Sequence, residues 1–492
     1  MTFDLAKAIA PLATDKTYTK KDMGVISLIL RADSYKFSHH QGYPTTARGM
    51  ACYGTARVDQ KQVIVPFGMQ ILLKRYLTQR ITMEDIDKAE AFALAHFGRK
   101  LFARDAWELV VTKYDGYLPL IIRNVPEGTK IRGGDPIYSV FCLDDNLFWM
   151  AAYFETLILR GIWYPTTIAT MDHEIKKAIK HYYELTGSDM SLLMFSLHDF
   201  GGRGVTCAEQ AEIGGAAHTV SFMGSDTDEG IITANEIYSE AMSAYSVAAT
   251  EHSIECSFGL DEEGEKAYLR HILTNVAVRG SIVSIVIDGR DVYRCAKFLC
   301  TEFRDMIIAS GCKVVFRPDS GDMMEVVPRL LRMMEVAFGY TMTTQGYKVI
   351  KYVGIIQGDG VDHLAITSLL GKMLVLGYAA QNVLFGSGGA LLQKVNRDTF
   401  KFAQKASAVL MEIDGVREWI GVSKDPITDP GKKSLEGILT LGKNVATGEY
   451  VIARLDRGEI NESVTDVMQL SYHTGTLYNE TTLAEVRSRV EA

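Results

Sequence analysis

The feature that most constrains the fold is a repeated alternation in the second half of the chain. Short apolar runs, rich in β-branched residues, end abruptly in segments rich in Asp and Gly. Four such runs span residues 281–287, 313–316, 352–356 and 382–385. Continuous apolar strands are typical of parallel sheets that are covered on both faces. The pattern therefore predicts buried parallel strands, with polar loops at the strand ends.

Amphipathic helices are predicted between these strands. Segments 292–310 and 323–338 carry apolar residues at three- and four-residue spacing, which is the helical signature. The strands begin about thirty to forty residues apart, the length of a βα unit. Successive βα units predict an α/β fold with an irregular (β/α) TIM-like barrel, whose active site lies at the carboxyl ends of the strands. A doubly wound open sheet would place its site similarly, so the pattern favours the barrel only modestly.

The rest of the chain is organised differently. With 492 residues the chain is too long for one ordinary compact core. Turn signals at 115–116 and 126–128 divide mixed strand and helix patterns near the N-terminus, and short strands and turns return near the C-terminus. We therefore expect a mixed α+β domain over 1–165, a (β/α) barrel-like catalytic domain over 166–400, and a C-terminal segment, 401–492, that packs back on the N-terminal domain.

Charge and composition narrow the classes of function. The net charge of −8 argues against a nucleic-acid surface, because polyanion binders usually carry a basic excess. No stretch approaches the roughly eighteen apolar residues of a membrane span, and the first twenty residues lack the apolar core of a secretory signal. The seven cysteines form no Cys-x-x-Cys pair, which favours reduced, buried thiols over a zinc site. We expect a cytoplasmic protein that binds neither nucleic acid nor membranes.

Charged residues gather where the alternation predicts loops. The segment 198–204 contains Arg203 among glycines, and an arginine fork suits phosphate or carboxylate; a tight turn with a surface arginine is an equally good alternative. For Asp226 alone, capping of the following helix is the better interpretation. Asp288 and Asp319 can hold ribose hydroxyls or water-coordinated magnesium, beside Arg317 for phosphate. Helix capping explains several aspartates in one ring of loops less well.

Two glycine-rich turns, 358–360 and 386–389, expose backbone N–H groups that could bind an anion. One such turn is a weak signal, but two beside Arg317 favour a phosphate-binding mouth. Basic residues that could complete this mouth, although a single one is usually only solvated, are Arg57, Arg397, Lys405 and Lys424. His252 follows Glu251, and a lone histidine is more often structural than catalytic. By themselves, the residues indicate an α/β enzyme with a phosphate-rich substrate.

Taken together, these segments resemble the nicotinamide phosphoribosyltransferase family, which belongs to the type II phosphoribosyltransferases. The similarity consists of short motifs in a fixed order, from residue 32 almost to the C-terminus. The motifs are Ala32-Asp-Ser-Tyr-Lys36, Tyr114-Asp-Gly116, Trp163-Tyr-Pro165, His198-Asp-Phe-Gly201, Arg203-Gly204, Glu251-His-Ser253, Arg317-Pro-Asp-Ser-Gly321, Gln357-Gly-Asp-Gly-Val-Asp362, Phe385-Gly-Ser-Gly-Gly389 and Lys424-Asp-Pro426. Their number and order make coincidence implausible.

The resemblance implies transfer of phosphoribosyl from phosphoribosyl pyrophosphate (PRPP) to nicotinamide in NAD salvage. The products would be nicotinamide mononucleotide and pyrophosphate, with Mg²⁺ as cofactor and ATP as co-substrate. Phe200 would stack on one face of nicotinamide, and Tyr35 from the second subunit of a homodimer would cover the other. Arg203 and Asp226 would meet the amide and the ring edge. His252 would be phosphorylated by ATP, which we expect to stimulate synthesis.

The same resemblance implies how the ribose and phosphates are held. Asp288, Arg317 and Asp319 would surround them, and the two aspartates would share the catalytic role with His252. The glycine turns would cradle the ribose and 5′-phosphate through Gly358, Asp359, Gly388 and Gly389. Phosphates would also be bound, in part across the dimer interface, by Arg57, Arg397, Lys405 and Lys424. Which residues would hold the metal stays open.

Some positions depart from the family pattern and some alternatives remain. Gly289-Arg290 stands where animal members carry Ser-Tyr, and Gly202 replaces an aromatic residue, which leaves substrate affinity and the strength of ATP coupling open. A carboxylate at Asp226 can accept from the carboxamide NH₂ and repels nicotinate, by roughly two orders of magnitude in specificity. The alternatives are a nicotinate phosphoribosyltransferase on the same fold, a non-catalytic binding protein, and a barrel enzyme acting on another sugar phosphate.

Overall fold

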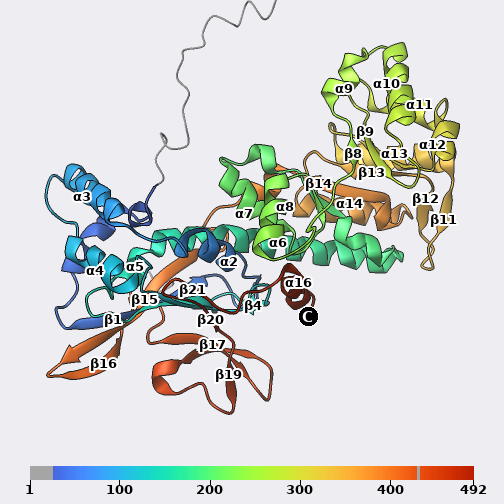
Figure 1. Ribbon diagram of the computed structural model, residues 1–492. Coiled ribbons are helices and arrows are strands. Elements are labelled where there is room, and N and C mark those ends of the chain that lie inside the picture. The colour runs from blue at the N-terminus through green and yellow to red at the C-terminus, as the bar shows by residue number, and fades with distance from the viewer. Residues whose placement is uncertain (1–25, 429–432) are drawn as a thin grey trace, which may run out of the picture.

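The computed structural model describes residues 26–428 and 433–492, so the prediction about the first twenty residues lies outside the described part of the chain. Two large sheets lie towards opposite ends of an elongated molecule, and the long helix α6 (Glu155–Thr186) runs between them (Figure 1). Within 26–428 and 433–492, no helix is both long and apolar enough to cross a membrane.

The first large sheet is antiparallel and combines strands from both ends of the sequence. In spatial order its strands are β16 (Val416–Gly421), β15 (Phe402–Ile413), β1 (Ala47–Ala56), β5 (Pro136–Cys142), β3 (Ile121–Asn124), β20 (Gln469–His473) and β21 (Thr476–Leu477). The N-terminal β1 pairs with C-terminal β15 on one side and with β5 on the other. This pairing confirms the expectation of an additional α+β unit built from N- and C-terminal segments.

Helices and two small sheets surround this antiparallel sheet. The helices are η2 (Leu28–Leu30), η3 (Ser34–Gln41), α2 (Met69–Leu72), η4 (Leu73–Leu77), α3 (Met83–Phe97), α4 (Arg104–Tyr114), α5 (Met150–Tyr153) and α16 (Leu483–Glu491). The small sheets are β2 (Val63–Ile64) with β4 (Ile131–Arg132), and β17 (Leu439–Asn444) with β18 (Tyr450–Arg454) and β19 (Val464–Asp466). Trp107 of α4 is buried in the core, where its ring meets those of Trp149 and Tyr153 edge-on at 5.7 and 5.3 Å between centroids.

The second large sheet is parallel and forms a half-barrel. In spatial order its strands are β7 (Gly224–Ser225), β6 (Leu197–Asp199), β14 (Val383–Ser387), β13 (Val353–Gln357), β10 (Lys313–Arg317), β9 (Ile282–Val286) and β8 (Ala248–Ala249). The four predicted apolar runs coincide with β9, β10, β13 and β14 to within two residues, which confirms them. Tyr245 donates its N–H to the Met223 carbonyl and accepts from Ser225, which links the β7 edge to the segment that leads into β8.

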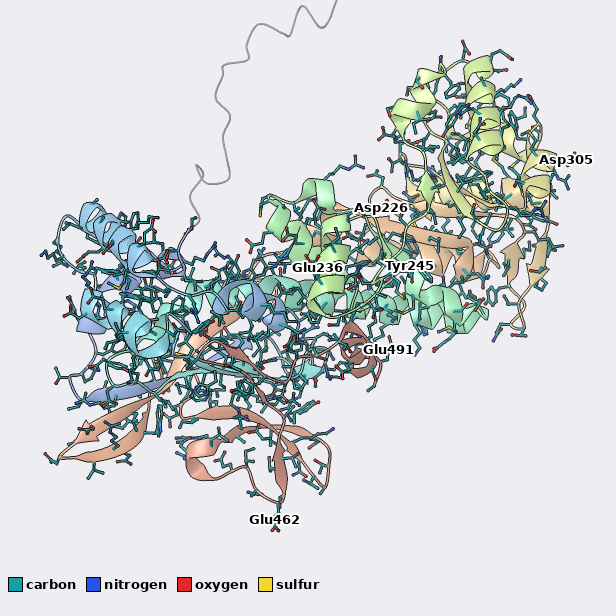
Figure 2. The ribbon with its side chains drawn as sticks, in the orientation of Figure 1. Asp226, Glu236, Tyr245, Asp305, Glu462 and Glu491 are labelled. Atoms are coloured by element: carbon teal, nitrogen blue, oxygen red, sulfur yellow. The ribbon has the colours of Figure 1, made fainter. Side chains whose placement is uncertain are left out.

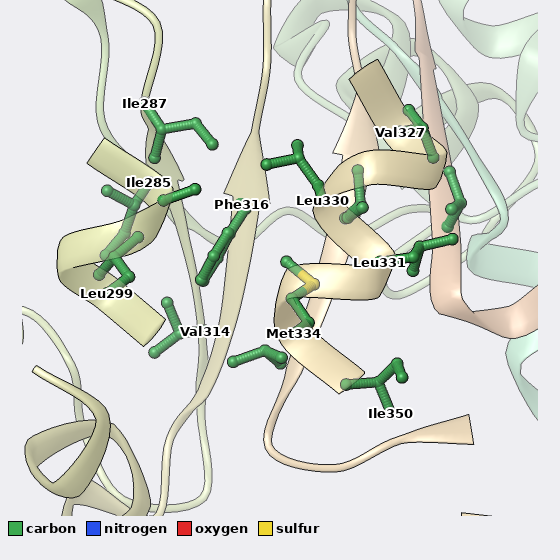
Figure 3. Packing of buried hydrophobic residues seen from close by; sticks show 14 of the residues in the cluster. Ile285, Ile287, Leu299, Val314, Phe316, Val327, Leu330, Leu331, Met334 and Ile350 are labelled. Carbon is green, nitrogen blue, oxygen red and sulfur yellow. The ribbon is translucent and has the colours of Figure 1, made fainter. Parts of the chain in front are cut away.

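Helices cover the parallel sheet, which accounts for the apolar runs of its longer strands. They are α7 (Ala208–His218), α8 (Asp228–Ile237), α9 (His252–Ser257), α10 (Glu262–Asn275), α11 (Val292–Cys300), α12 (Arg304–Ser310), α13 (Met323–Phe338), α14 (His363–Val375) and α15 (Gly389–Leu392). Phe316 of β10 lies between α11 and α13, facing Leu330 and Met334 (Figure 3). Each such buried side chain contributes about 1.5–3 kcal/mol, so this core holds the strand ends, and hence the loops, in place.

Two further sequence predictions can be compared with the fold. Five of the seven cysteines are buried free thiols, but Cys207 and Cys256 are exposed, so the expectation of buried thiols is wrong for these two. Cys207 lies in the loop that leads into α7, and Cys256 lies on the solvent side of the short α9. Helix α6 runs without interruption through residue 165, and the domain boundaries at 165 and 400 stay a prediction.

A candidate active site at the mouth of the half-barrel

Phe200 lies where three strand-end loops meet. Its backbone N–H donates to the Ser387 carbonyl at 2.9 Å, which fixes the loop after β6 on β14. Its ring occupies the space that a side chain at Gly386 would need, because an ideal Cβ there would lie 2.0 Å from Phe200 Cε2. A Cβ on Gly358, after β13, would lie 3.8 Å from the same ring atom. The two glycines thus allow an aromatic ring to rest against strand ends.

Asp226 follows β7 with an exposed side chain. Its backbone N–H donates to the Asp199 carbonyl at 2.9 Å, and its carboxylate accepts a short hydrogen bond from Ser246. Asp226 and Tyr245 lie in the middle of the molecule, beside α8 (Figure 2). Arg203, in the short turn η6 (Gly202–Gly204), is exposed to solvent. Since β6 and β7 are paired neighbours, the loops that carry Arg203 and Asp226 open on the same edge of the sheet.

Asp288 is the centre of a second cluster, at the ends of β9 and β10. Its Oδ1 accepts from His252 Nε2 at 3.0 Å, and its Oδ2 accepts from the Asp319 N–H at 3.0 Å and from Ser320 Oγ at 2.5 Å. The Asp288 side chain is 3% exposed, whereas His252 is 45% exposed. The cluster therefore presents an accessible imidazole whose Nε2 is held by a buried carboxylate.

The capping interpretation fails for all three aspartates that the sequence singled out. The N-cap positions of the helices that follow them are occupied by Thr227, Asp291 and Asp322. Asp226, Asp288 and Asp319 precede these caps and leave their carboxylates for other partners. This outcome favours a binding role for them over a purely structural one.

Arg317 and the glycine turns complete the mouth. Arg317 Nη2 donates to the Thr250 carbonyl, while its Nε is buried without a partner among the described residues. An ideal Cβ on Gly358 would lie 3.1 Å from Asp319 Oδ1, so the β10 and β13 loops touch. Asp359 is exposed, and its backbone carbonyl accepts from Gln357 Nε2 at 2.8 Å.

Gly388 and Gly389 begin a helix that is only one turn long. Gly388 occupies the N-cap position of α15, and a Cβ on it would lie 3.4 Å from the Phe200 carbonyl oxygen. Helix α15 spans only Gly389–Leu392, so the second glycine turn opens into a single helical turn. The close approach of Gly388 to Phe200 places the second glycine turn beside the aromatic ring.

Three of the predicted basic residues lie on the antiparallel sheet or next to it. Arg57 follows β1, and its Nε donates to the Lys401 carbonyl at 3.3 Å. Lys405 lies on β15 opposite Tyr53, and Lys424 follows β16. Burial lowers the pKa of Lys405; the charge of Glu155 opposes this effect, and those of Arg57 and Lys424 add to it. Three cations thus lie close enough to repel one another, as in an anion-binding site. We call them the basic cluster.

Two other candidates lie on the same side of the fold. Tyr35 on η3 is 57% exposed, and its ring meets His39 edge-on, at 4.8 Å, and Lys36, at 5.4 Å. Arg397 is exposed, pairs with Asp398 at 3.1 Å, and lies in the segment that leads into β15. Within residues 26–428 and 433–492, neither side chain forms a hydrogen bond or ion pair with the loops at the half-barrel mouth.

One chain therefore carries the predicted site in two separate groups. Phe200, Asp226 and Asp288 sit on loops of the parallel sheet, whereas the basic cluster and Tyr35 belong to the other end of the fold (Figure 1). In the described part of the chain, no hydrogen bond or ion pair joins the basic cluster to the loops at the half-barrel mouth. Of the predicted cations, Arg203 and Arg317 lie at the half-barrel mouth, whereas Arg397 and the basic cluster do not.

Sequence reasoning missed a buried ion pair beneath the mouth. His218 of α7 donates from Nε2 to the Gly224 carbonyl at 2.9 Å, and its Nδ1 meets Asp172 Oδ2 of α6 at 2.8 Å. Both side chains are fully buried. The pair anchors the start of β7, two residues before Asp226. Nothing in the sequence pattern relates Asp172 to His218, because they belong to different helices.

The carboxylates at the mouth fit a magnesium ion that arrives with its substrate. Within the described residues, no cluster of three or more His, Cys, Asp or Glu could hold a metal by itself. Mg²⁺ usually keeps several waters and is bound by one or two carboxylates together with substrate phosphates. Asp288 and Asp319, joined by a hydrogen bond at the ends of neighbouring strands, could offer such contacts through water.

Comparison with known proteins places this chain in a family. The Nicotinate phosphoribosyltransferase (NAPRTase) family matches residues 195–473, and the Nicotinamide phosphoribosyltransferase N-terminal domain matches residues 27–122. The chain is 41% identical over 469 residues to the Nicotinamide phosphoribosyltransferase of Xanthomonas campestris pv. campestris (strain 8004), covering 95% of this chain and 98% of that protein. The chain belongs to the nicotinamide phosphoribosyltransferase family. The match spans both sheets, so the family's whole architecture is present.

A more distant member and two solved structures agree with this assignment. The Nicotinamide phosphoribosyltransferase of Acinetobacter baylyi (strain ATCC 33305 / BD413 / ADP1) is 30% identical, covering 93% of this chain and 96% of that protein. A nicotinate-nucleotide pyrophosphorylase from Pyrococcus furiosus superposes with a TM-score of 0.58 at 14% identity, covering 97% of both chains. Human Nicotinic Acid Phosphoribosyltransferase gives 0.54 at 14% identity, covering 93% of this chain and 92% of that chain. These likenesses show the type II phosphoribosyltransferase fold.

Proposed function

We propose that this protein transfers phosphoribosyl from PRPP to nicotinamide, giving nicotinamide mononucleotide and pyrophosphate in NAD salvage. The observation that carries the proposal is the Phe200 ring, which rests on Gly386 beside Asp319 and the glycine turns at one mouth. A flat aromatic face suits an uncharged heteroaromatic ring. Carboxylates and backbone N–H groups around it suit a ribose and its phosphates.

The proposed reaction exchanges one bond at the ribose. The bond from the ribose anomeric carbon to the pyrophosphate oxygen breaks, and a bond from that carbon to the nicotinamide ring nitrogen forms. The anomeric carbon becomes positively charged on the way, and the Asp288 and Asp319 carboxylates would stabilise that charge. Arg317, whose Nε has no protein partner within the described residues, would contact phosphate. Mg²⁺ bound with PRPP would neutralise the departing pyrophosphate.

Asp226 would select the amide over the acid. Its carboxylate does not cap the following helix, whose N-cap is Thr227, and it accepts a hydrogen bond from Ser246, which orients it. It would accept a hydrogen bond from the nicotinamide carboxamide, with Arg203 nearby on the neighbouring loop. Nicotinate would bring a second negative charge to the same place. The other activity that this fold supports, on nicotinate, therefore requires a different environment at this position.

His252 would couple ATP to synthesis. Its Nε2 donates to Asp288, so the opposite nitrogen, Nδ1, carries the lone pair and can attack the γ-phosphorus of ATP, with ADP as the leaving group. The 45% exposure of the ring leaves room for that phosphate. A phosphohistidine beside Asp288 would act at the same carboxylate that serves the ribose. We expect ATP to stimulate rather than to be obligatory.

A homodimer would complete the site. The antiparallel sheet side carries Tyr35, Arg397 and the basic cluster. Within the described residues, none of them is bonded to the half-barrel mouth of the same chain. In an isologous dimer, each half-barrel can face the partner's antiparallel sheet. Tyr35 would then cover nicotinamide, while Arg57, Lys405 and Lys424 would bind phosphates. We also propose that domain 166–400 is an irregular barrel, in which Tyr245 links the β7 edge of the half-barrel to the segment that leads into β8.

Product formation tests the activity. Purified protein incubated with PRPP, Mg²⁺ and nicotinamide should yield nicotinamide mononucleotide and pyrophosphate in equal amounts. Phe200→Ala should raise the KM for nicotinamide, whereas Tyr182→Ala, a half-buried aromatic on α6 that lies against Gly371 of α14, serves as a matched control. If Phe200→Ala changes the kinetics no more than Tyr182→Ala does, the aromatic platform is wrong.

Mixed dimers test the shared site. Tyr35→Ala and Phe200→Ala proteins should each be weakly active, and unfolding and refolding them together should restore about one quarter of the wild-type activity, because one site of each heterodimer is intact. Two copies of the same variant mixed in the same way provide the control. Absence of recovery in heterodimers that have formed would place both aromatic rings in the site of a single chain.

A further inference from the structure

Glu255 is a buried acid that the roles assigned so far do not use. It lies on α9, three residues after His252, and the residue is 1% exposed. Its Oε2 accepts from the Gly289 backbone N–H at 3.0 Å. Gly289 directly follows Asp288 in the loop after β9. The carboxyl group thus ties the helix that carries His252 to the loop that carries Asp288.

The contact depends on the absence of a side chain at residue 289. An ideal Cβ on Gly289 would lie 2.5 Å from Glu255 Oε2 and 2.7 Å from its Cδ. Any larger residue there would push the carboxyl group away from the loop. The absence of a side chain at Gly289 is therefore what gives Glu255 room to reach the loop.

Helix α9 holds the β9 loop at two successive residues. His252 donates to the side chain of Asp288, and Glu255 accepts from the backbone of Gly289. Because Asp288 Oδ2 is also held by the Asp319 N–H and by Ser320, a small shift of the loop changes every contact of that carboxylate. The second attachment point fixes the distance between His252 and Asp288.

We propose that Glu255 is a positioning residue, which acts through Gly289 to hold Asp288 against His252 and so sets how strongly ATP stimulates synthesis. The inference rests on the proposed role of His252. Glu255 itself need touch neither substrate nor phosphate. Its effect is on the geometry of the pair that does.

The surroundings of Glu255 are consistent with an uncharged carboxyl group. Burial, together with the neighbouring charges of Asp288 and Glu265, raises its pKa to about 7, although the hydrogen bond from Gly289 and the charge of His252 act in the opposite direction. Arg294, on helix α11, is already paired with Glu265 at 2.7 Å. The other titratable groups that face Glu255 are His252, Tyr268 and Cys295. A neutral group can hold the loop without repelling Asp288 or an incoming phosphate, and an amide could replace it.

The test compares Glu255→Gln with Glu255→Ala. The amide oxygen of Gln can still accept from Gly289, so Glu255→Gln should keep the ratio of ATP-stimulated to ATP-independent synthesis within about twofold. Glu255→Ala leaves the N–H without its acceptor and should lower that ratio about fivefold to tenfold, more than it lowers the ATP-independent rate. Glu262→Ala, an exposed acid at the start of α10, is the control and should match wild type.

A double-mutant cycle separates positioning from simple loss of stability. Gly289→Ala should lower the ratio in the wild-type background, through the clash with Glu255. In the Glu255→Ala background the same change should cost much less, because the obstructing carboxyl group is gone. If the two effects are additive, or if Glu255→Gln loses stimulation as fully as Glu255→Ala, the proposal is wrong.

A readout without ATP keeps this proposal distinct from the role of His252. The imidazole NMR signals of His252 should shift in Glu255→Ala and remain as in wild type in Glu255→Gln. If wild type shows no ATP stimulation but these shifts occur, the role of His252 fails and the positioning stands. If the His252 signals in Glu255→Ala equal those of wild type, the positioning is overturned.

Discussion

Gly386→Ala is the smallest change that disturbs the proposed nicotinamide site. The new methyl group would lie 2.0 Å from Phe200 Cε2, 2.3 Å from Cδ2 and 2.8 Å from Cζ. Real non-bonded contacts of this kind exceed 3 Å, so the ring must move by about an ångström or more. The backbone is held by the Phe200 N–H donating to Ser387, so the side chain must yield.

The magnitude follows from what the ring loses. Turning the ring away from its preferred rotamer costs about 0.5–1.5 kcal/mol. The bound nicotinamide would also lose much of its stacking, worth about 0.5–1.5 kcal/mol. Together these effects amount to about 1–3 kcal/mol, or roughly 5- to 150-fold in kcat/KM for nicotinamide. The KM for PRPP should change much less, because the clash does not involve the phosphate-binding residues.

Steady-state kinetics with varied nicotinamide measure this effect, and Gly354→Ala provides a matched control. Gly354 lies on the neighbouring strand β13, where an added Cβ would meet nothing closer than Lys313 Cε at 3.4 Å. Gly354→Ala should therefore behave as wild type. The reasoning is refuted if Gly386→Ala leaves the KM for nicotinamide unchanged while folding normally, or if Gly354→Ala changes it equally.

Three further predictions concern single side chains. Burial lowers the pKa of His198 from 6.5 to about 4, so its contribution to stability is complete above pH 6.5 and is lost as pH falls towards 4. In denaturant unfolding, the free energy of unfolding of His198→Gln should fall by about 3 kcal/mol less than that of wild type over that pH range. Parallel plots of this free energy against pH would contradict the prediction. Asp226→Ser should reduce the preference for nicotinamide over nicotinate by roughly a hundredfold in kcat/KM; an unchanged ratio would remove Asp226 from substrate selection. His252→Ala should keep ATP-independent synthesis but lose its response to ATP, and a normal response would place phosphorylation elsewhere.

The parallel sheet could be predicted from sequence where its strands are long and buried on both faces. Residues 313–316 contain three apolar residues in a row, and β10 buries Val314, Val315 and Phe316 alike. The short strands gave no such signal. Residues 192–195 are apolar but belong to a 3₁₀ turn, η5 (Met190–Phe195), and β6 begins only at Leu197, which is followed by the polar residues His198 and Asp199.

The residues of the candidate site could be named from their motifs, but their grouping could not be predicted. Phe200 and Gly386 are distant in sequence, and only the pairing of β6 with β14 reveals that one makes room for the other. The contact of Glu255 with Gly289 likewise joins separate elements without any periodic signal. The resemblance implies a shared site that includes Arg57, and the structure places Arg57 after β1 of the other sheet; the sharing itself stays a prediction. Cytoplasmic location stays a prediction.

The central claim is that this protein makes nicotinamide mononucleotide and selects the amide. One competition experiment tests it most directly. The protein is incubated with PRPP, Mg²⁺ and equal concentrations of nicotinamide and nicotinate, and both mononucleotides are quantified. Our account predicts nicotinamide mononucleotide in at least about a hundredfold excess. Nicotinate mononucleotide as the main product, or formation of neither, would contradict it.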